Sequence, residues 1–187
     1  MSGPHRTAMP LIKNPLIARA ALAVVTAGVV LSVVSGCGLS EARQAEAVAS
    51  QEVQLQEFID QADAWGADII AQAPEEEAKA IYENFGGSRD AYYKEWPQYY
   101  YWAQGVDLYP DGPRTPTEFA DDLEPWLEDQ GWVRNLDKEF PPDRDSYVRD
   151  YVRGRYSLAV EVYTVTPPQA QSLKFRIVTP RTDPNPP

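Results

Sequence analysis

The residues capable of acid–base or nucleophilic chemistry are unevenly distributed along this chain of 187 residues. The only histidine, His5, and the only cysteine, Cys37, lie near the N-terminus, and neither residue type occurs again. Residues 38–187 therefore lack the side chains of Ser-His-Asp and Cys-His mechanisms and the usual ligands of zinc, iron and copper. Neither a GxGxxG nor a GxxxxGK[ST] nucleotide-binding motif is present. An enzyme built from this segment would have to use carboxylates alone.

Two carboxylate clusters are the remaining candidates for catalysis. Asp121, Asp122 and Glu124 form one cluster, and Asp143 and Asp145 form the other. Two such groups could act as acid and base on a glycosidic bond if they faced each other about 5–9 Å apart. The chain holds 28 acidic residues, however, and these clusters fall on surfaces expected to be exposed. We favour a solvated acidic face and predict no catalytic residue.

Calcium is the metal that this sequence could best accommodate. Oxygen ligands occur at short spacing in the segment 107–112 (DLYPDG) and again at Asp143 and Asp145. Neither segment matches the twelve-residue calcium-binding loop. Turn formation explains Asp111-Gly112 equally well. We therefore predict no metal site and no cofactor.

A run of aromatic residues is the most distinctive feature of the chain. Exposed rings in this run could stack on sugar rings of a cell wall or anchor a protein partner. Alternatively, helices cover both faces of the strand and the rings belong to the core. If the run is a binding surface, Trp96, Tyr99 or Tyr101 should be exposed in one patch. The run consists of Tyr92, Tyr93, Trp96, Tyr99, Tyr100, Tyr101 and Trp102.

The first 36 residues have the composition of an export signal. They contain basic side chains and no acidic ones, and residues 20–34 form an uncharged apolar stretch. Val34-Ser35-Gly36-Cys37 follows at the end of that stretch and resembles the lipobox of bacterial lipoprotein precursors. The resemblance implies cleavage between Gly36 and Cys37 and a diacylglyceryl group on the Cys37 thiol. The alternative is an uncleaved membrane-anchor helix in which Cys37 has no role.

Acyl chains on Cys37 would hold the protein at the extracytoplasmic face of the cell membrane, since two or more chains anchor stably. Removal of residues 1–36 would leave the product more acidic than the whole chain, whose formal charge is −11. Such a domain repels nucleic acid, because phosphate contacts need Lys and Arg. In style, the chain also resembles small actinobacterial lipoproteins of unassigned function.

The apolar pattern predicts a helix from residue 54 to Pro74, with Leu55, Phe58, Ala62, Trp65 and Ile69 on one face. A second, short helix is expected over residues 75–85, before Gly86-Gly87. The best-defined helix starts at Thr115-Pro116-Thr117-Glu118, a capping box with proline at the first helical position, and ends at Gly131.

Alternating apolar residues predict strands over 98–108, 146–152, 155–164 and 172–178, with a short strand opening at Trp132. The segment 144–153 also fits an amphipathic helix. The expected fold is α+β, with N-terminal helices packed on one face of an antiparallel sheet of about four to five strands. The domain organisation is a signal peptide (1–36), a lipidated tether (37–53), a single domain (54–179) and a disordered tail (180–187).

These expectations favour a non-enzymatic binding or accessory lipoprotein of the cell envelope, in contact with an envelope protein or a wall glycan. The competing hypothesis is a carboxylate-only hydrolase acting on cell-wall polysaccharide. A hydrolase requires two carboxylates opposite each other in one cleft, with at least one of them buried.

Overall fold

The computed structural model describes residues 16–83, 87–89, 96–140, 145–169 and 171–185. The chain divides into two compact units, residues 1–46 and residues 47–187. Helix α1 (Leu16–Ile70) includes the segments expected to be the apolar signal stretch and the tether. In the described part of the chain, no helix has the length and hydropathy that crossing a membrane requires.

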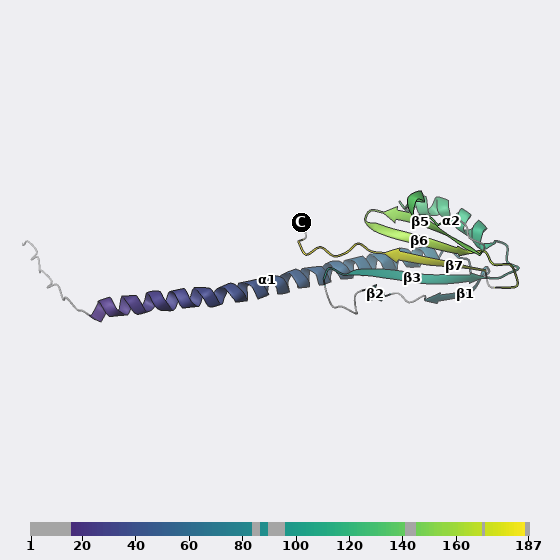
Figure 1. The fold of residues 1–187 in the computed structure, drawn as a ribbon. Coiled ribbons are helices and arrows are strands. Elements are labelled where there is room, and N and C mark those ends of the chain that lie inside the picture. The colour runs from purple at the N-terminus through teal and green to yellow at the C-terminus, as the bar shows by residue number, and fades with distance from the viewer. Residues whose placement is uncertain (1–15, 84–86, 90–95, 141–144, 170, 186–187) are drawn as a thin grey trace, which may run out of the picture. The chain divides into compact units, whose positions relative to one another are not determined.

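An antiparallel sheet organises the second unit (Figure 1). Its strands lie in the order β1-β3-β7-β6-β5-β4, and the short β2 also pairs with β3. The α+β class is confirmed, but the expected four to five strands are too few. The strands are β1 (Ala78–Glu83), β2 (Gly87–Arg89), β3 (Tyr99–Leu108), β4 (Val133–Arg134), β5 (Ser146–Arg153), β6 (Tyr156–Tyr163) and β7 (Gln171–Val178).

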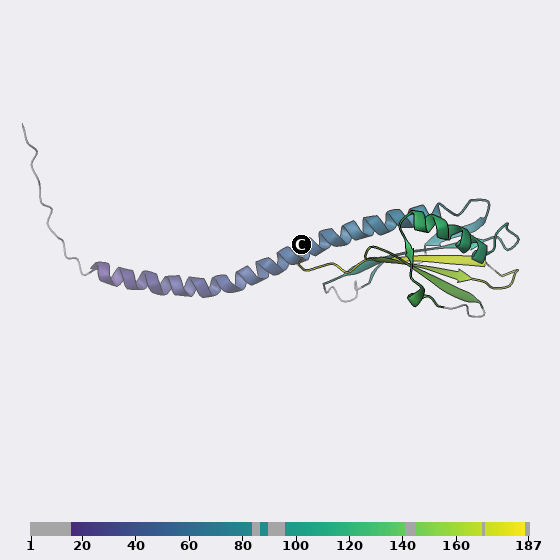
Figure 2. The same cartoon turned by 90° about the horizontal axis from the view of Figure 1, so that it is seen from above.

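Within the second unit, the α1 segment from Ala47 onward and helix α2 (Pro116–Asp129) lie on the same side of the sheet (Figure 2). The expected fold named only N-terminal helices on the sheet, but the helices are not all N-terminal, because α2 follows β3. Trp65 of α1 packs edge-on against Trp132 and Tyr156, with ring centroids 5.4 Å and 4.9 Å apart. Apolar residues of both helices and of the central strands form one core, in which Phe119, Leu127, Leu158, Leu173 and Ile177 are buried.

The expected helix over residues 75–85 is wrong, because Ala78–Glu83 form the edge strand β1. This segment pairs with β3, with Ile81 opposite Val106 and Tyr82 opposite Gly105. A Cβ atom added to Gly105 would lie 2.4 Å from the Tyr82 ring, so the ring rests on the bare glycine backbone. Pairing with a distant strand outweighs the helical preference of the Glu-Ala-Lys sequence.

The capping box of α2 is confirmed. The Thr115 hydroxyl accepts a hydrogen bond from the Glu118 N–H at 3.2 Å, and the Glu118 carboxylate accepts one from the Thr115 N–H at 2.8 Å. Gly131 follows the helix with φ +85°, a conformation that glycine adopts without strain. The helix therefore begins and ends where the local sequence predicts.

The three C-terminal strands are also confirmed, and the ambiguous segment around residue 148 is strand β5 and not a helix. Leu173, Phe175 and Ile177 of β7 are buried against the helices, whereas Lys174 and Arg176 point to the other face. The alternation of side chains predicted for this strand is therefore observed.

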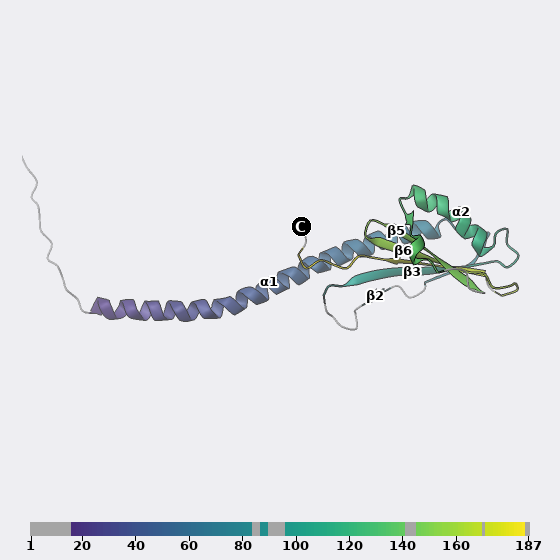
Figure 3. The ribbon, with the colours of Figure 1, turned by 45° about the horizontal axis from the view of Figure 1, so that its top comes forward.

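A disordered tail was expected from residue 180, but residues 180–185 run alongside the rest of the unit (Figure 3). Thr182 is 3% exposed, and its hydroxyl donates to Gln51 Oε1 at 3.0 Å. The Gln54 amide donates to the Asp183 carbonyl and accepts from the Asp183 N–H, both at 3.0 Å. Two glutamines of α1 thus fix the segment that follows β7.

Candidate functional site

A groove lies on the face of the sheet opposite to the two helices. From β3 it is lined by Tyr99, Tyr101 and Ala103, and from β7 by Lys174, Phe175, Arg176 and Val178. Ala159, Glu161 and Val148 complete the lining from β6 and β5. The cavity volume is about 510 Å³, which is within the range of small-molecule sites. We call this cavity the open-face groove.

Small side chains produce the groove. Arg176 pairs with Ala159 on one side and with Ala103 on the other. In the next row of the sheet, Lys174 lies between Glu161 and Gly105. Because Ala103 and Ala159 fill little space, a shallow groove forms over them, and the longer side chains around them line its sides. The register of β7 with β3 and β6, which places an alanine on each side of Arg176, therefore produces the open-face groove.

Two of the three aromatic residues predicted to form a binding surface line this groove. Tyr99 and Tyr101 are both half-buried and share the open face of β3, whereas Tyr100 and Trp102 point to the helices. Trp96 is half-buried too, but it is not part of the groove lining. In the part of the chain that the structure describes, helices therefore cover only one face of this strand. The other proposed aromatic residues, Tyr92 and Tyr93, lie outside the described residues.

Charged groups stand at both ends of the groove, with Glu161 and Lys174 in the row of Gly105 and Arg181 beside Tyr99. The Tyr163 hydroxyl donates to Glu161 Oε1 at 2.6 Å, and Lys174 Nζ donates to the Tyr163 oxygen at 3.1 Å. The hydrogen bond to Tyr163 raises the pKa of Lys174 above its ordinary value, so the ammonium group stays charged. The guanidinium carbon of Arg181 lies 5.6 Å from the centroid of the Tyr99 ring.

Arg176 differs from the other basic residues of the groove. It is exposed, and within the described part of the chain it forms no ion pair at 4.0 Å or less. Asp150 lies in the same row of the sheet, beyond Ala159, and accepts a hydrogen bond from Asn135. Arg176 thus presents a guanidinium group to the groove.

Glu161, Lys174 and Arg176 were not predicted as site residues. The alternation of apolar residues along 155–164 and 172–178 puts all three on the polar face of their strands, and in the structure Glu161 lies opposite Lys174. The missing information was the pairing of β3 with β7, which joins residues about seventy positions apart in the sequence. Without that pairing, nothing connects the tyrosines to the charges.

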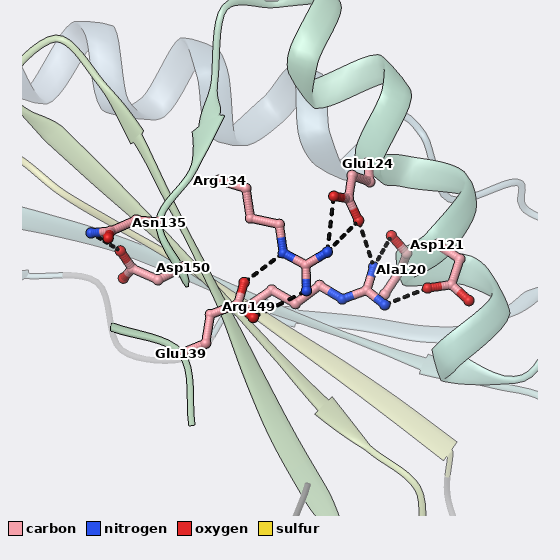
Figure 4. Close-up of polar contacts among 8 residues, drawn as sticks. All are labelled: Ala120, Asp121, Glu124, Arg134, Asn135, Glu139, Arg149 and Asp150. Carbon is pink, nitrogen blue, oxygen red and sulfur yellow. Dashed lines mark hydrogen bonds and ion pairs between the residues drawn. The ribbon is translucent and has the colours of Figure 1, made fainter. Parts of the chain in front are cut away.

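The predicted carboxylate cluster at residues 121–124 lies elsewhere, on α2, and takes part in an ion-pair network (Figure 4). Arg149 of β5 is 8% exposed and contacts Asp121, Glu124 and the Ala120 carbonyl. Arg134 donates to Glu124 at 3.0 Å and to Glu139 at 2.6 Å and 3.0 Å. The network joins α2 to β5 and to the segment after β4.

This network gives each of its carboxylates an arginine partner, and Asp122 likewise contacts Arg114 at 3.2 Å. Asp121 and Glu139 do line a second cavity, but the two guanidinium groups line it with them. Asp145 is exposed, and Asp143 lies outside the described residues. The geometry accounts for these acids as charge partners that hold α2 on the sheet.

Asp107, Asp111 and Asp145 are the candidate calcium ligands that the structure describes. Asp107 lies on β3, and Asp111 lies in the turn before α2. Within the described ranges, no group of three or more His, Cys, Asp or Glu residues could hold a metal ion.

The residues of the lipobox-like motif belong to the first unit of the chain. Gly36 and Cys37 both lie within the bounds of helix α1. No protein-family model, curated protein or solved structure matches this chain, so its function has to be inferred from its own residues.

Proposed function

We propose that this chain is a lipid-anchored binding protein of the cell envelope, held on the extracytoplasmic face of the membrane through Cys37. In this proposal the open-face groove is the binding site, and its ligand is a glycan of the cell wall. The protein acts by binding and not by catalysis. The observation that carries the proposal is the groove itself, which combines tyrosine rings with charged hydrogen-bonding groups.

The anchor is supported by the sequence Val34-Ser35-Gly36-Cys37 at the end of an uncharged apolar stretch. Cleavage before Cys37 and acylation of its thiol would leave an acidic domain attached to the membrane by its N-terminus. Two or three acyl chains bury enough CH2 groups for stable attachment, at about 0.8 kcal/mol for each group. Residues 38–46 would then separate the lipid from the second unit.

The choice of a glycan is supported by the chemistry of the groove. Tyrosine rings, such as those of Tyr99 and Tyr101 in the lining, offer flat apolar surfaces for the C–H faces of sugar rings. Glu161 accepts hydrogen bonds, while Lys174 and Arg176 donate them, so both kinds of partner for sugar hydroxyls are present. The volume of about 510 Å³ suits a short stretch of saccharide better than a protein surface.

Co-sedimentation with insoluble cell-wall material tests this function. The whole chain, purified in detergent, is expected to sediment with the wall material, and Tyr99→Ala is expected to weaken sedimentation about fivefold or more. This expectation reflects the contribution of about 1–3 kcal/mol that ring stacking makes to ligand binding.

Tyr109→Ala is the matched control, since Tyr109 is a 43% exposed tyrosine that follows the other end of β3, outside the groove lining. Circular dichroism must show that both variants are folded. Equal losses for Tyr99→Ala and Tyr109→Ala, or no sedimentation of the unaltered chain, would contradict the proposed function.

A further inference from the structure

We propose that the ligand of the open-face groove is an acidic saccharide, whose carboxylate is bound by Arg176 while a sugar ring lies against Tyr99. This inference rests on the proposed function and specifies the ligand class of the same site. It is carried by the charges around the groove, which contrast with those of the rest of the molecule.

The whole chain is strongly acidic, with a formal charge of −11, yet basic groups predominate around this groove. Lys174 and Arg176 line it, and Arg181 lies over the ring of Tyr99. Among the described residues, Glu161 is the one acidic residue in the lining, and it already accepts a hydrogen bond from Tyr163. Asp150 stands in the row of Arg176, beyond Ala159, and accepts a hydrogen bond from Asn135. A local excess of cations on an acidic protein attracts an anion to this face.

Arg176 differs from three other arginines in the number of ion pairs that it forms. Arg114, Arg134 and Arg149 each form two ion pairs within the described part of the chain, whereas Arg176 forms none. A guanidinium group with no ion-pair partner can form two parallel hydrogen bonds with a ligand carboxylate, the geometry that arginine suits best.

Neighbouring residues orient the rest of such a ligand. Ala103 and Ala159 flank Arg176 in its row of the sheet, so a sugar ring can approach the backbone there. Glu161 and Lys174, one row further, form a chain of hydrogen bonds through Tyr163 and keep fixed positions. These two groups can accept from and donate to the hydroxyl or acetamido groups of the saccharide.

Two disaccharides of N-acetylated hexosamines that differ in one carboxylate test this inference. N-acetylglucosaminyl-N-acetylmuramic acid carries a lactyl carboxylate, and chitobiose has none. Titration calorimetry on the whole chain in detergent is expected to show at least about fivefold tighter binding of the acidic disaccharide, in keeping with a bidentate ion pair at an exposed site. Added salt should weaken only the binding of the acidic disaccharide.

Arg176→Gln is expected to abolish the preference for the acidic disaccharide, and Arg176→Lys to retain part of it. Arg155→Gln is the matched control, because Arg155 is an exposed arginine at the β5–β6 turn that does not line the groove. A full preference in Arg176→Gln would overturn the inference.

Equal affinity of the unaltered chain for both disaccharides would also overturn the acidic ligand, while leaving a saccharide in the groove. If the chain binds neither disaccharide, the inferred ligand class is wrong. The proposed function is then still judged separately, by the sedimentation of the Tyr99 variant with wall material.

Discussion

Arginine has two different roles in this protein, and the surroundings of each side chain decide which one it has. Arg149 is 8% exposed and satisfies its charge through Asp121, Glu124 and a backbone carbonyl. Arg176 is exposed on the open face and has no ion pair within the described residues. The first contributes to the stability of the fold, and the second is available to a ligand.

The substitution Arg149→Met is expected to destabilise the second unit by about 2 kcal/mol, because it leaves Asp121 and Glu124 close together without their shared cation. This expected destabilisation is smaller than the loss from breaking a fully buried ion pair, because the Asp121 side chain is 56% exposed. Urea unfolding of the whole chain, followed by tryptophan fluorescence, measures the change. All five tryptophans lie in the second unit.

The control for this prediction is Arg155→Met, which removes an exposed arginine and should change the free energy of unfolding by less than about 0.5 kcal/mol. A similarly small change in Arg149→Met would mean that the network adds nothing to stability.

Single residues could be predicted from the sequence only where the signal is local. Thr115 and Glu118 form a capping box within four residues, and the structure contains it. The alternation of Tyr99 and Tyr101 with Tyr100 and Trp102 along a strand puts the first two on one face, and in the structure both line the open-face groove. The role of Arg176 depends on which strands flank it, and no local pattern of the sequence contains that information.

At the scale of elements, β3, β5, β6, β7 and α2 could be predicted, because each has a regular apolar pattern bounded by turn or capping residues. The edge strand β1 could not. Its residues favour a helix locally, and they become a strand only because β3 offers an unpaired edge. The order of strands could not be predicted either, because β3 pairs with β7 although helix α2 and the three strands β4, β5 and β6 lie between them in the sequence.

The packing of α1 on β3 leads to a prediction about Gly66. A Cβ atom at this position would lie 2.2 Å from the Trp102 ring, which is 7% exposed and cannot move aside freely. Because alanine has a higher helix propensity than glycine, Gly66→Ala alone would stabilise helix α1 by about 1 kcal/mol. Overpacking costs about 1–3 kcal/mol or more, so a net destabilisation of about 1 kcal/mol is expected in urea unfolding.

Gly66→Ala combined with Trp102→Phe separates the two contributions, because the smaller ring leaves room for the methyl group. The alanine should be less destabilising in the Trp102→Phe background than in the unaltered chain. A Gly66→Ala variant that is more stable than the unaltered chain would show that α1 does not approach β3 this closely.

At the scale of the whole molecule, the proposed function attaches an acidic domain to a lipid through Cys37 and gives it a ligand on one face of its sheet. The open-face groove belongs to the second unit, and Cys37 belongs to the first. Anchor and groove can therefore be tested by separate substitutions. In the proposed function, the ligand class depends on Arg176 and the location of the protein depends on Cys37.

Incorporation of a labelled fatty acid in growing bacterial cells tests the lipid anchor on Cys37. The unaltered chain should incorporate the label and fractionate with membranes, and Cys37→Ser should incorporate none and leave the membrane fraction, because the serine hydroxyl does not replace the thiol. An unlabelled wild-type protein, or a Cys37→Ser variant that fractionates with membranes as before, would contradict a lipid anchor.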